Sequence, residues 1–394
     1  MESTPGLPSL SVEPGSLAAR LGAVPDRRRT ASVCYPLPAV LILTVAATLA
    51  GHHSVLAIAQ WIARQAPTTL QALGFPPGRV PCQSTLHRIL RDLDLAALVG
   101  QVQAAFAPIT APAPDALQGI ALDGKAQRGR QRFTGWDYAV HAVSAVCHHS
   151  GLIVAQEPIA QDPAQHDSEL PAATRLLARL EWRNRVLTGD RLYCGQDLCR
   201  RVCAAGGAYL LSIGRNRGPQ HTAIAACFAA PEPGRVIRCA HTEESGHGRR
   251  QERREIRVIA DVIGLTCLRQ WPGLQQIFQL QRSWWERGVQ HTAISYGITS
   301  LTPAQAGPAH LLRLRRGHWT IENRVHWSRD VTFGEDASQV RAGAGPDVLS
   351  VLRGAAITLL HHDAPHHLTA RIRAFSQFPL QAITLVCRTL SPRA

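Results

Sequence analysis

Two aspartates stand where β-strands are predicted to end, and their side chains could bind a divalent cation. Asp123 follows the apolar run in ALDGK, and Asp190 ends the run in RVLTGD. Gly124 permits a tight exit after Asp123, so this carboxylate would project from a strand edge. Two carboxylates at the ends of strands in one sheet suit Mg²⁺ or Mn²⁺, which prefer oxygen ligands. Either Asp taken alone is more typical of an ordinary turn.

A helix predicted to begin near Arg316 carries a third carboxylate on a polar stripe. Residues three or four apart share a face of an α-helix. The members of this stripe are His318, Glu322, His326 and Arg329. The neighbouring stripe holds Trp319 and Trp327. We expect these aromatic side chains to pack the helix on its sheet.

The polar stripe has two interpretations. His318, Glu322 and His326 could bind zinc directly, but the H-E-x-x-H motif is absent and no thiolate lies nearby in the sequence. Alternatively, Glu322 completes an Asp, Asp, Glu site while the His and Arg side chains contact phosphate. The second interpretation is favoured by the basic charge of the chain. Such a site suits phosphodiester chemistry, in which two cations activate the attacking oxygen and stabilise the leaving oxygen.

The charge of the chain points to a polyanionic partner. Lys+Arg number 42 against 28 for Asp+Glu, which gives +14 and a pI near 10.1. These residues are spread along the whole chain, which favours nucleic acid over a membrane surface. The single lysine, Lys125, lies two residues after Asp123 and could contact a phosphate as a point charge.

Other features of the sequence predict a cytoplasmic protein without a membrane anchor. The ten Cys residues form no C-x-x-C pair, so reduced thiols are expected. The N-terminus lacks the order of a signal peptide. The apolar run from Leu37 to Ala50 is shorter than the roughly 20 residues of a membrane span, and it is predicted to be a buried helix.

The pattern of apolar residues predicts an α/β core interrupted by a β insertion. The predicted regions are a loose lead-in (1–25), a helical region (26–112), the first part of the core (113–214), a β-rich insertion (215–300), the second part of the core (301–364) and a C-terminal tail (365–394). Basic positions around His87 and Arg88 could form a DNA-binding helix-turn-helix, although a plain helical bundle is favoured because GFPPGRVP is longer than a tight turn.

Five stretches resemble one known family of mobile-element proteins. They are ALDGKAQRG, VLTGDRLYC, HGRRQERRE, WPGLQQI and HWTIENRVHWSRDVTFGEDASQVRAG, the last being the most specific. They are similar to those of DDE-class insertion-sequence transposases of the ISAs-one type, also called H-repeat-associated proteins. The resemblance extends from about residue 26 to about residue 361. It implies a ribonuclease-H-like mixed-sheet core with an antiparallel β insertion and an N-terminal helical region.

The resemblance also implies an activity and its residues. The catalytic and metal-binding carboxylates would be Asp123, Asp190 and Glu322, holding two Mg²⁺ or Mn²⁺ ions. The substrates would be double-stranded DNA, namely terminal inverted repeats and target DNA, cut and joined by a homodimer assembled on that DNA. Compared with related transposases, Arg329 stands where Lys is usual and His318 where Arg is usual.

Several basic side chains are predicted to contact DNA. They are Lys125, Arg128, Arg249, Arg250, Arg253, Arg254, His318, His326 and Arg329. The four Arg residues from 249 to 254 could equally form a solvated charged hairpin. An alternative function is that of a domesticated or inactive DNA-binding protein that retains the transposase fold.

Overall fold

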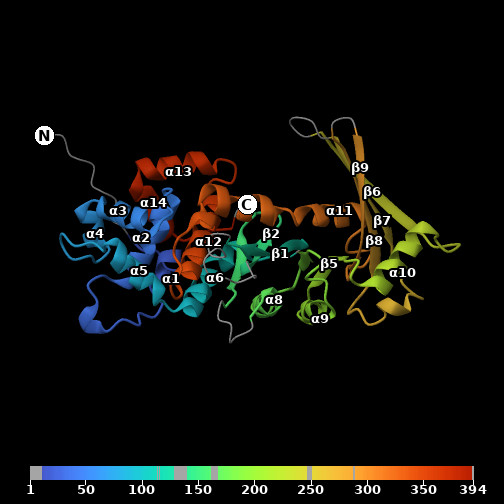
Figure 1. Ribbon diagram of the computed structural model, residues 1–394, viewed down its shortest axis with the longest axis horizontal. Coiled ribbons are helices and arrows are strands. Elements are labelled where there is room, and N and C mark those ends of the chain that lie inside the picture. The colour runs from blue at the N-terminus through green and yellow to red at the C-terminus, as the bar shows by residue number, and fades with distance from the viewer. Residues whose placement is uncertain are drawn as a thin grey trace.

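Three regions follow one another along the long axis of the molecule (Figure 1). A helical domain lies at one end, a sheet with helices on both faces occupies the centre, and an arm of antiparallel strands forms the other end. The computed structural model describes residues 11–112, 114, 116–127, 140–160, 167–245, 251–286 and 289–392.

The central sheet has mixed strand directions. Its strands are β1 (Gln118–Ala126), β2 (Val140–Cys147), β3 (Ile153–Pro158), β4 (Arg185–Gly189) and β5 (Ala208–Ile213). β1, β4 and β5 run parallel, whereas β2 and β3 are antiparallel neighbours at one edge. The parallel strands are short apolar runs without alternation, as expected where both faces of a sheet are covered. The predicted ribonuclease-H-like α/β core is therefore confirmed.

Helices cover the two faces of this sheet. α8 (Glu169–Ala178), α9 (Gln196–Ala204) and α10 (Gly218–Ala229) pack on one face, where Leu176 and Leu198 join the same buried cluster as Leu187. On the opposite face, α11 (Pro308–Gly317) buries Leu311 against strand residues. The chain leaves α11 directly toward the centre of the sheet, so this helix connects the arm region to the predicted site (Figure 1).

The predicted antiparallel insertion forms the arm, and it extends the central sheet. Its strands are β6 (Ile237–Ser245), β7 (Gln251–Ile259), β8 (Gln276–Glu286) and β9 (Val289–Thr299). β9 pairs with β5, with Leu211 opposite Ile298, so a single sheet runs in the order β3-β2-β1-β4-β5-β9-β8-β7-β6. The arm therefore continues the sheet of the core.

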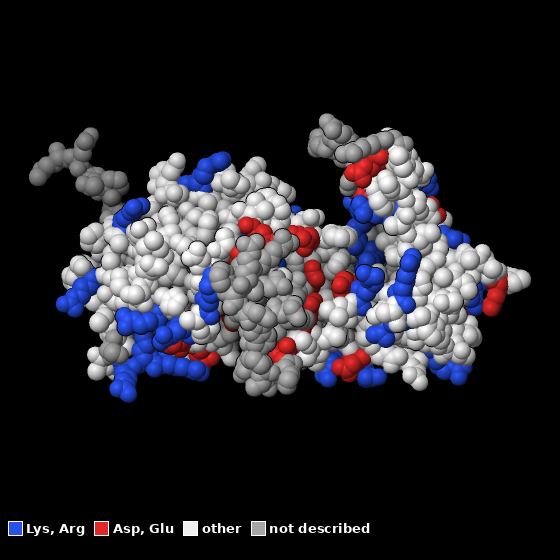
Figure 2. Space-filling view, viewed as in Figure 1, with Lys and Arg blue, Asp and Glu red and all other residues white. Residues whose placement is uncertain are grey.

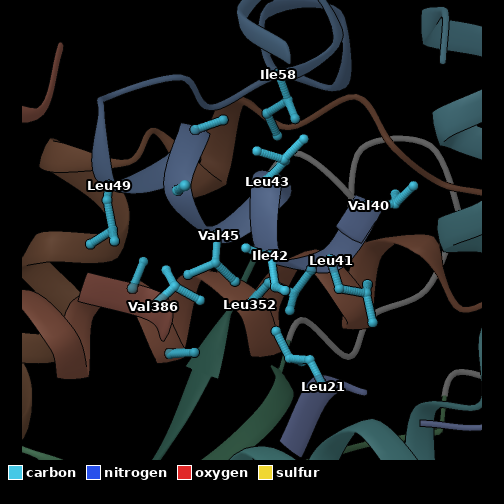
Figure 3. Close-up of a cluster of buried hydrophobic side chains, with 14 of the residues drawn as sticks. Leu21, Val40, Leu41, Ile42, Leu43, Val45, Leu49, Ile58, Leu352 and Val386 are labelled. Carbon is cyan, nitrogen blue, oxygen red and sulfur yellow. The ribbon is translucent and has the colours of Figure 1, made fainter. Parts of the chain in front are cut away.

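The helical domain is assembled from both ends of the chain. Its helices are α1 (Leu17–Leu21), α2 (Leu37–Leu49), α3 (Val55–Ala63), α4 (Pro67–Ala72), α5 (Gln83–Arg91), α6 (Leu95–Thr110), α12 (Gly345–Asp363), α13 (Leu368–Gln377) and α14 (Pro379–Cys387). α2 is buried around nearly its whole circumference. Figure 3 shows its side chains among Leu21, Leu352 and Val386, which come from α1, α12 and α14. Burial of this kind stabilises by roughly 1.5–3 kcal/mol for each large apolar side chain.

This arrangement differs from the predicted regions at both termini. The described part of the lead-in is not loose, because Ser16 caps α1 and Leu17 and Leu21 are buried. The predicted tail contains α13 and α14, and α12 packs mainly within the helical domain although it also contacts β3. α4 lies between α3 and α5, and residues 73–82 separate α4 from α5, so these helices are not joined by a tight turn.

No single helix in the described ranges has both the length and the apolar content of a membrane span. Only α5 and α6 taken together meet both criteria, and this pair is bent by 89°.

Candidate active site

Asp123 and Asp190 lie next to each other where β4 ends. Leu122 of β1 is paired with Gly189, the last residue of β4, so the two aspartates follow at neighbouring positions. β1 itself continues to Ala126 beside β2, which means that Asp123 lies within the strand and not at its end. The carboxylate of Asp123 accepts a hydrogen bond from the Gly124 N–H at 3.0 Å, and that of Asp190 accepts one from the Leu192 N–H at 2.8 Å.

The helix that carries Glu322 changes to π-helical geometry at the site. Two π-helical segments, η4 (Ile321–His326) and η5 (Ser328–Thr332), follow α11. The N–H of Trp327 donates to the C=O of Glu322, five residues earlier. π-helical turns are rare and occur often at functional sites. The wider turn rotates Arg329 away from Glu322, so the polar stripe predicted from α-helical spacing is broken.

Aliphatic side chains, not the tryptophans, hold this segment on the sheet. Ile321 and Val325 pack against Ala121, Val146 and Ile153 in a small buried cluster. Trp319 and Trp327 remain 58% and 54% exposed. The prediction that the tryptophans anchor the helix was therefore wrong.

Glu322 and His326 lie close to Asp123, because their helical segment packs on β1. His326 Nδ1 lies 2.9 Å from Glu322 Oε2 and 3.7 Å from Asp123 Oδ2. One donor atom from each of the three residues lies within 4.8 Å of the others. Of the predicted carboxylates, the structure therefore brings Glu322 to Asp123, with Asp190 at the neighbouring strand position.

The negative charge of the Asp123 carboxylate is not fully balanced by nearby positive charge. Burial raises the pKa of Asp123 to about 6, and the negative charges of Asp190 and Glu169 add to this effect. The nearby His326 opposes it but does not cancel it. A bound cation would supply the missing positive charge. The carboxylates of Asp123, Asp190 and Glu322 offer the oxygen ligands that Mg²⁺ or Mn²⁺ prefers. The residues present thus fit a divalent metal.

The raised pKa predicts that Asp123→Asn stabilises the ion-free protein at pH 7 by about 1 to 3 kcal/mol. The protonated carboxyl contributes stability that is present below the ordinary pKa of 3.8 and is lost as the pH rises through about 6. Urea unfolding in the presence of a chelator measures the difference. The gain should be small at pH 4 and reach its full size above pH 7. A variant of equal or lower stability at pH 8 would contradict this.

Glu169 is a fourth carboxylate that reasoning from the sequence missed. It is the first residue of α8, its side chain accepts a hydrogen bond from the Tyr193 O–H, and its charge acts on Asp123. Burial raises the pKa of Glu169, and Asp190 contributes in the same direction. In the sequence this residue has the ordinary signature of an acidic first turn, so only the packing of α8 against the sheet reveals it.

The predicted DNA-contacting residues have varied surroundings. Lys125 Nζ lies 2.7 Å from Asp330 Oδ2. Arg253 pairs with Glu243 and Glu255, and Arg254 pairs with Glu244 and Glu252. Arg128, Arg249 and Arg250 lie outside the described residues.

Arg329 is buried, which contradicts the predicted DNA contact. Its side chain is only 1% exposed. The partners of its guanidinium are Glu335 (3.2 Å), Ser350 (2.7 Å) and Gln156 (2.8 Å). Arg353 shares Glu335 and donates to the C=O of His53 in the helical domain. Glu335 therefore lies between two buried arginines.

His318 is also placed differently from the prediction. Its Nδ1 lies 3.4 Å from the Thr188 hydroxyl, which also bonds His148 at 2.8 Å. Burial, followed by the charge of Arg315, lowers the pKa of His318 to about 3, so the ring is neutral at pH 7 and cannot attract phosphate by charge. Because His318 is not part of the cluster around Asp123, the zinc set of His318, Glu322 and His326 does not form.

Comparisons with known proteins agree with this geometry. Residues 114–359 match the family model described as "Transposase DDE domain", and residues 18–105 match one described as "DDE_Tnp_1-associated". "Putative transposase YncI" of Escherichia coli O157:H7 is 26% identical over 357 residues, which cover 88% of this chain and 87% of that protein. "H repeat-associated putative transposase YhhI" of Escherichia coli (strain K12) is 25% identical over 365 residues, covering 88% and 90%.

Proposed function

Because the chain belongs to the DDE transposase domain family, we propose that it cleaves DNA at the ends of an insertion sequence and joins the freed ends to target DNA. The observation that carries this proposal is that Glu322 lies beside Asp123, with Asp190 at the neighbouring strand position. Asp123 and Asp190 follow neighbouring positions of two parallel strands, and Glu322 reaches Asp123 from a helix far along the chain.

The three carboxylates would hold two Mg²⁺ or Mn²⁺ ions. These ions would activate the attacking oxygen and stabilise the leaving oxygen of the phosphodiester. The protein supplies positions for the ligands: β1 and β4 fix the two aspartates, and the aliphatic contacts of Ile321 and Val325 hold the Glu322 segment against the sheet. Hydrolysis would free a 3′-hydroxyl at each end, and that hydroxyl would then attack target DNA.

The charge distribution supports DNA as the partner. Figure 2 shows acidic side chains gathered over the central sheet and a band of basic side chains, which are arginines, on the adjacent side of the arm. A backbone of phosphates would be attracted to this band while the carboxylates take up cations. We propose that the protein acts in the bacterial cytoplasm as a homodimer on DNA, since two ends must be cut in concert.

The proposal is tested with a labelled duplex that carries the ends of the element. Wild-type protein with Mg²⁺ should cut one strand at each end, whereas Glu322→Gln should leave the duplex intact. A duplex of unrelated sequence and a reaction without Mg²⁺ are the controls. Cleavage by the variant at the wild-type rate would exclude Glu322 from the site. Specific binding by the wild type without any cleavage would instead favour a DNA-binding protein that has lost its activity.

A further inference from the structure

His326 has surroundings that differ from those of a DNA-contacting side chain. Its ring is 4% exposed, and its Nδ1 faces Glu322 and Asp123. We propose that His326 supplies a nitrogen ligand to the cation held by Asp123 and Glu322, so that the site is selective for metals that accept imidazole. This inference rests on the proposed metal-dependent function and adds a residue outside the carboxylate triad.

The distances fit a shared coordination sphere. Donor atoms about 2.1 Å from an octahedral ion lie about 3 Å apart when they are neighbours and about 4 Å apart when they are opposite. The separations of 2.9 Å from His326 Nδ1 to Glu322 Oε2 and 3.7 Å to Asp123 Oδ2 fall within these limits. One ligand atom from each of the three residues lies within 4.8 Å of the others. One ion could therefore contact them with little movement of the protein.

Burial leaves His326 little other role in binding. A phosphate contact, which the sequence predicted, requires a nitrogen that DNA can reach, and the ring is almost completely enclosed. Its Nε2 is buried and has no hydrogen-bond partner among the described residues. Among the described residues, its Nδ1 thus faces the two carboxylates that form the metal site. The neighbouring Val325 is 0% exposed in the cluster that fixes this segment, so the ring cannot readily turn outward.

The chemical consequence is a change in metal preference. Carboxylates suit both Mg²⁺ and Mn²⁺, but an imidazole nitrogen suits transition metals better than Mg²⁺. With His326 as a ligand, the protein should bind Mn²⁺ more tightly than a site of carboxylates alone. If His326 instead only donates its Nδ1–H to Glu322, it positions that carboxylate and no nitrogen touches the ion.

A spectroscopic experiment separates these two roles without DNA or turnover. The full-length protein is loaded with Mn²⁺, and electron spin-echo envelope modulation detects any nitrogen bonded to the ion. Wild-type protein should show ¹⁴N modulation, and protein labelled with ¹⁵N-histidine should show the corresponding ¹⁵N pattern. His326→Gln should lose the modulation and bind Mn²⁺ at least about 10-fold more weakly, with a smaller effect on Mg²⁺. His291→Gln, which changes a histidine on β9 of the arm, is the matched control and should behave as wild type.

The outcomes distinguish this inference from the proposed function. Mn²⁺ that binds wild-type protein without nitrogen modulation, and is weakened by Asp123→Asn, would overturn the role of His326 while leaving the carboxylate site intact. Mn²⁺ binding that is unaffected by Asp123→Asn would overturn both. The isotope labelling uses wild-type protein. It would therefore show whether a histidine nitrogen binds the ion even if His326→Gln failed to fold.

Discussion

Replacing Asp190 with Asn is expected to reduce DNA cleavage at least about 100-fold, which is the upper end of the loss seen when a group that merely supports a metal ligand is removed. Asn has the shape of Asp but lacks its charge, so it is a poor ligand for a divalent cation. The side chain is exposed, and its hydrogen bond from the Leu192 N–H can be retained by the Asn carbonyl oxygen. The free energy of unfolding should therefore change by less than about 0.5 kcal/mol.

Single-turnover cleavage and urea unfolding measure these two effects. Asp197→Asn is a matched control, since its side chain on α9 is 63% exposed and pairs only with Arg200 and Arg201 in the described structure. It should cleave as wild type. If Asp190→Asn cleaved DNA at a rate within about tenfold of the wild-type rate, Asp190 would not be a metal ligand. A large loss of stability would show that the activity was lost through unfolding.

Glu335→Gln is expected to lower the free energy of unfolding by about 3 to 5 kcal/mol, the usual cost of removing one partner from a buried ion pair. The carboxylate is 1% exposed and lies between Arg329 and Arg353. Without its charge, two buried guanidinium groups would face each other without compensation. Because these arginines connect the Glu322 segment to α12 and to the C=O of His53, cleavage should fall as well.

Urea unfolding at pH 7 checks this prediction, and its dependence on pH gives a second check. Burial alone would raise the pKa of Glu335, but Arg329 and Arg353 outweigh it and hold the pKa at about 2. The stabilising contribution is present above the ordinary pKa of 4.5 and is lost as the pH falls toward about 2. The wild type and the variant should therefore converge in acid. Glu232→Gln, a 74% exposed partner of Arg235, should cost less than about 1 kcal/mol. A loss of similar size in both variants would refute the special role of Glu335.

The sequence predicted those parts of the fold that depend on local patterns. The strands that carry Asp123 and Asp190 are short runs of apolar residues bounded by turns, and such runs are recognisable without knowledge of their neighbours. The insertion was predicted for the same reason. Its junction with β5 was not, because the pairing of Leu211 with Ile298 joins residues distant in the chain.

The site was predicted only where it depends on local sequence patterns. Spacing along a helix placed Glu322 beside His326, and this contact forms. The same spacing placed the aromatic stripe against the sheet, which is wrong, because Ile321 and Val325 pack there beside Ala121. The burial of Arg329 depends on Glu335 and α12, which no local pattern reveals.

The helical domain can complete its folding only after nearly the whole chain has been synthesised. α2 is enclosed by α14, and the Glu13 N–H donates to the C=O of Cys387, so residues separated by most of the chain complete one apolar core. While a ribosome is still translating the central sheet, α2 has no partner for the surface that α14 will cover. Domains near the N-terminus usually fold first during translation. Here the helical domain is among the last parts to close, and a nascent chain that stops before α14 exposes one of its most apolar helices to aggregation.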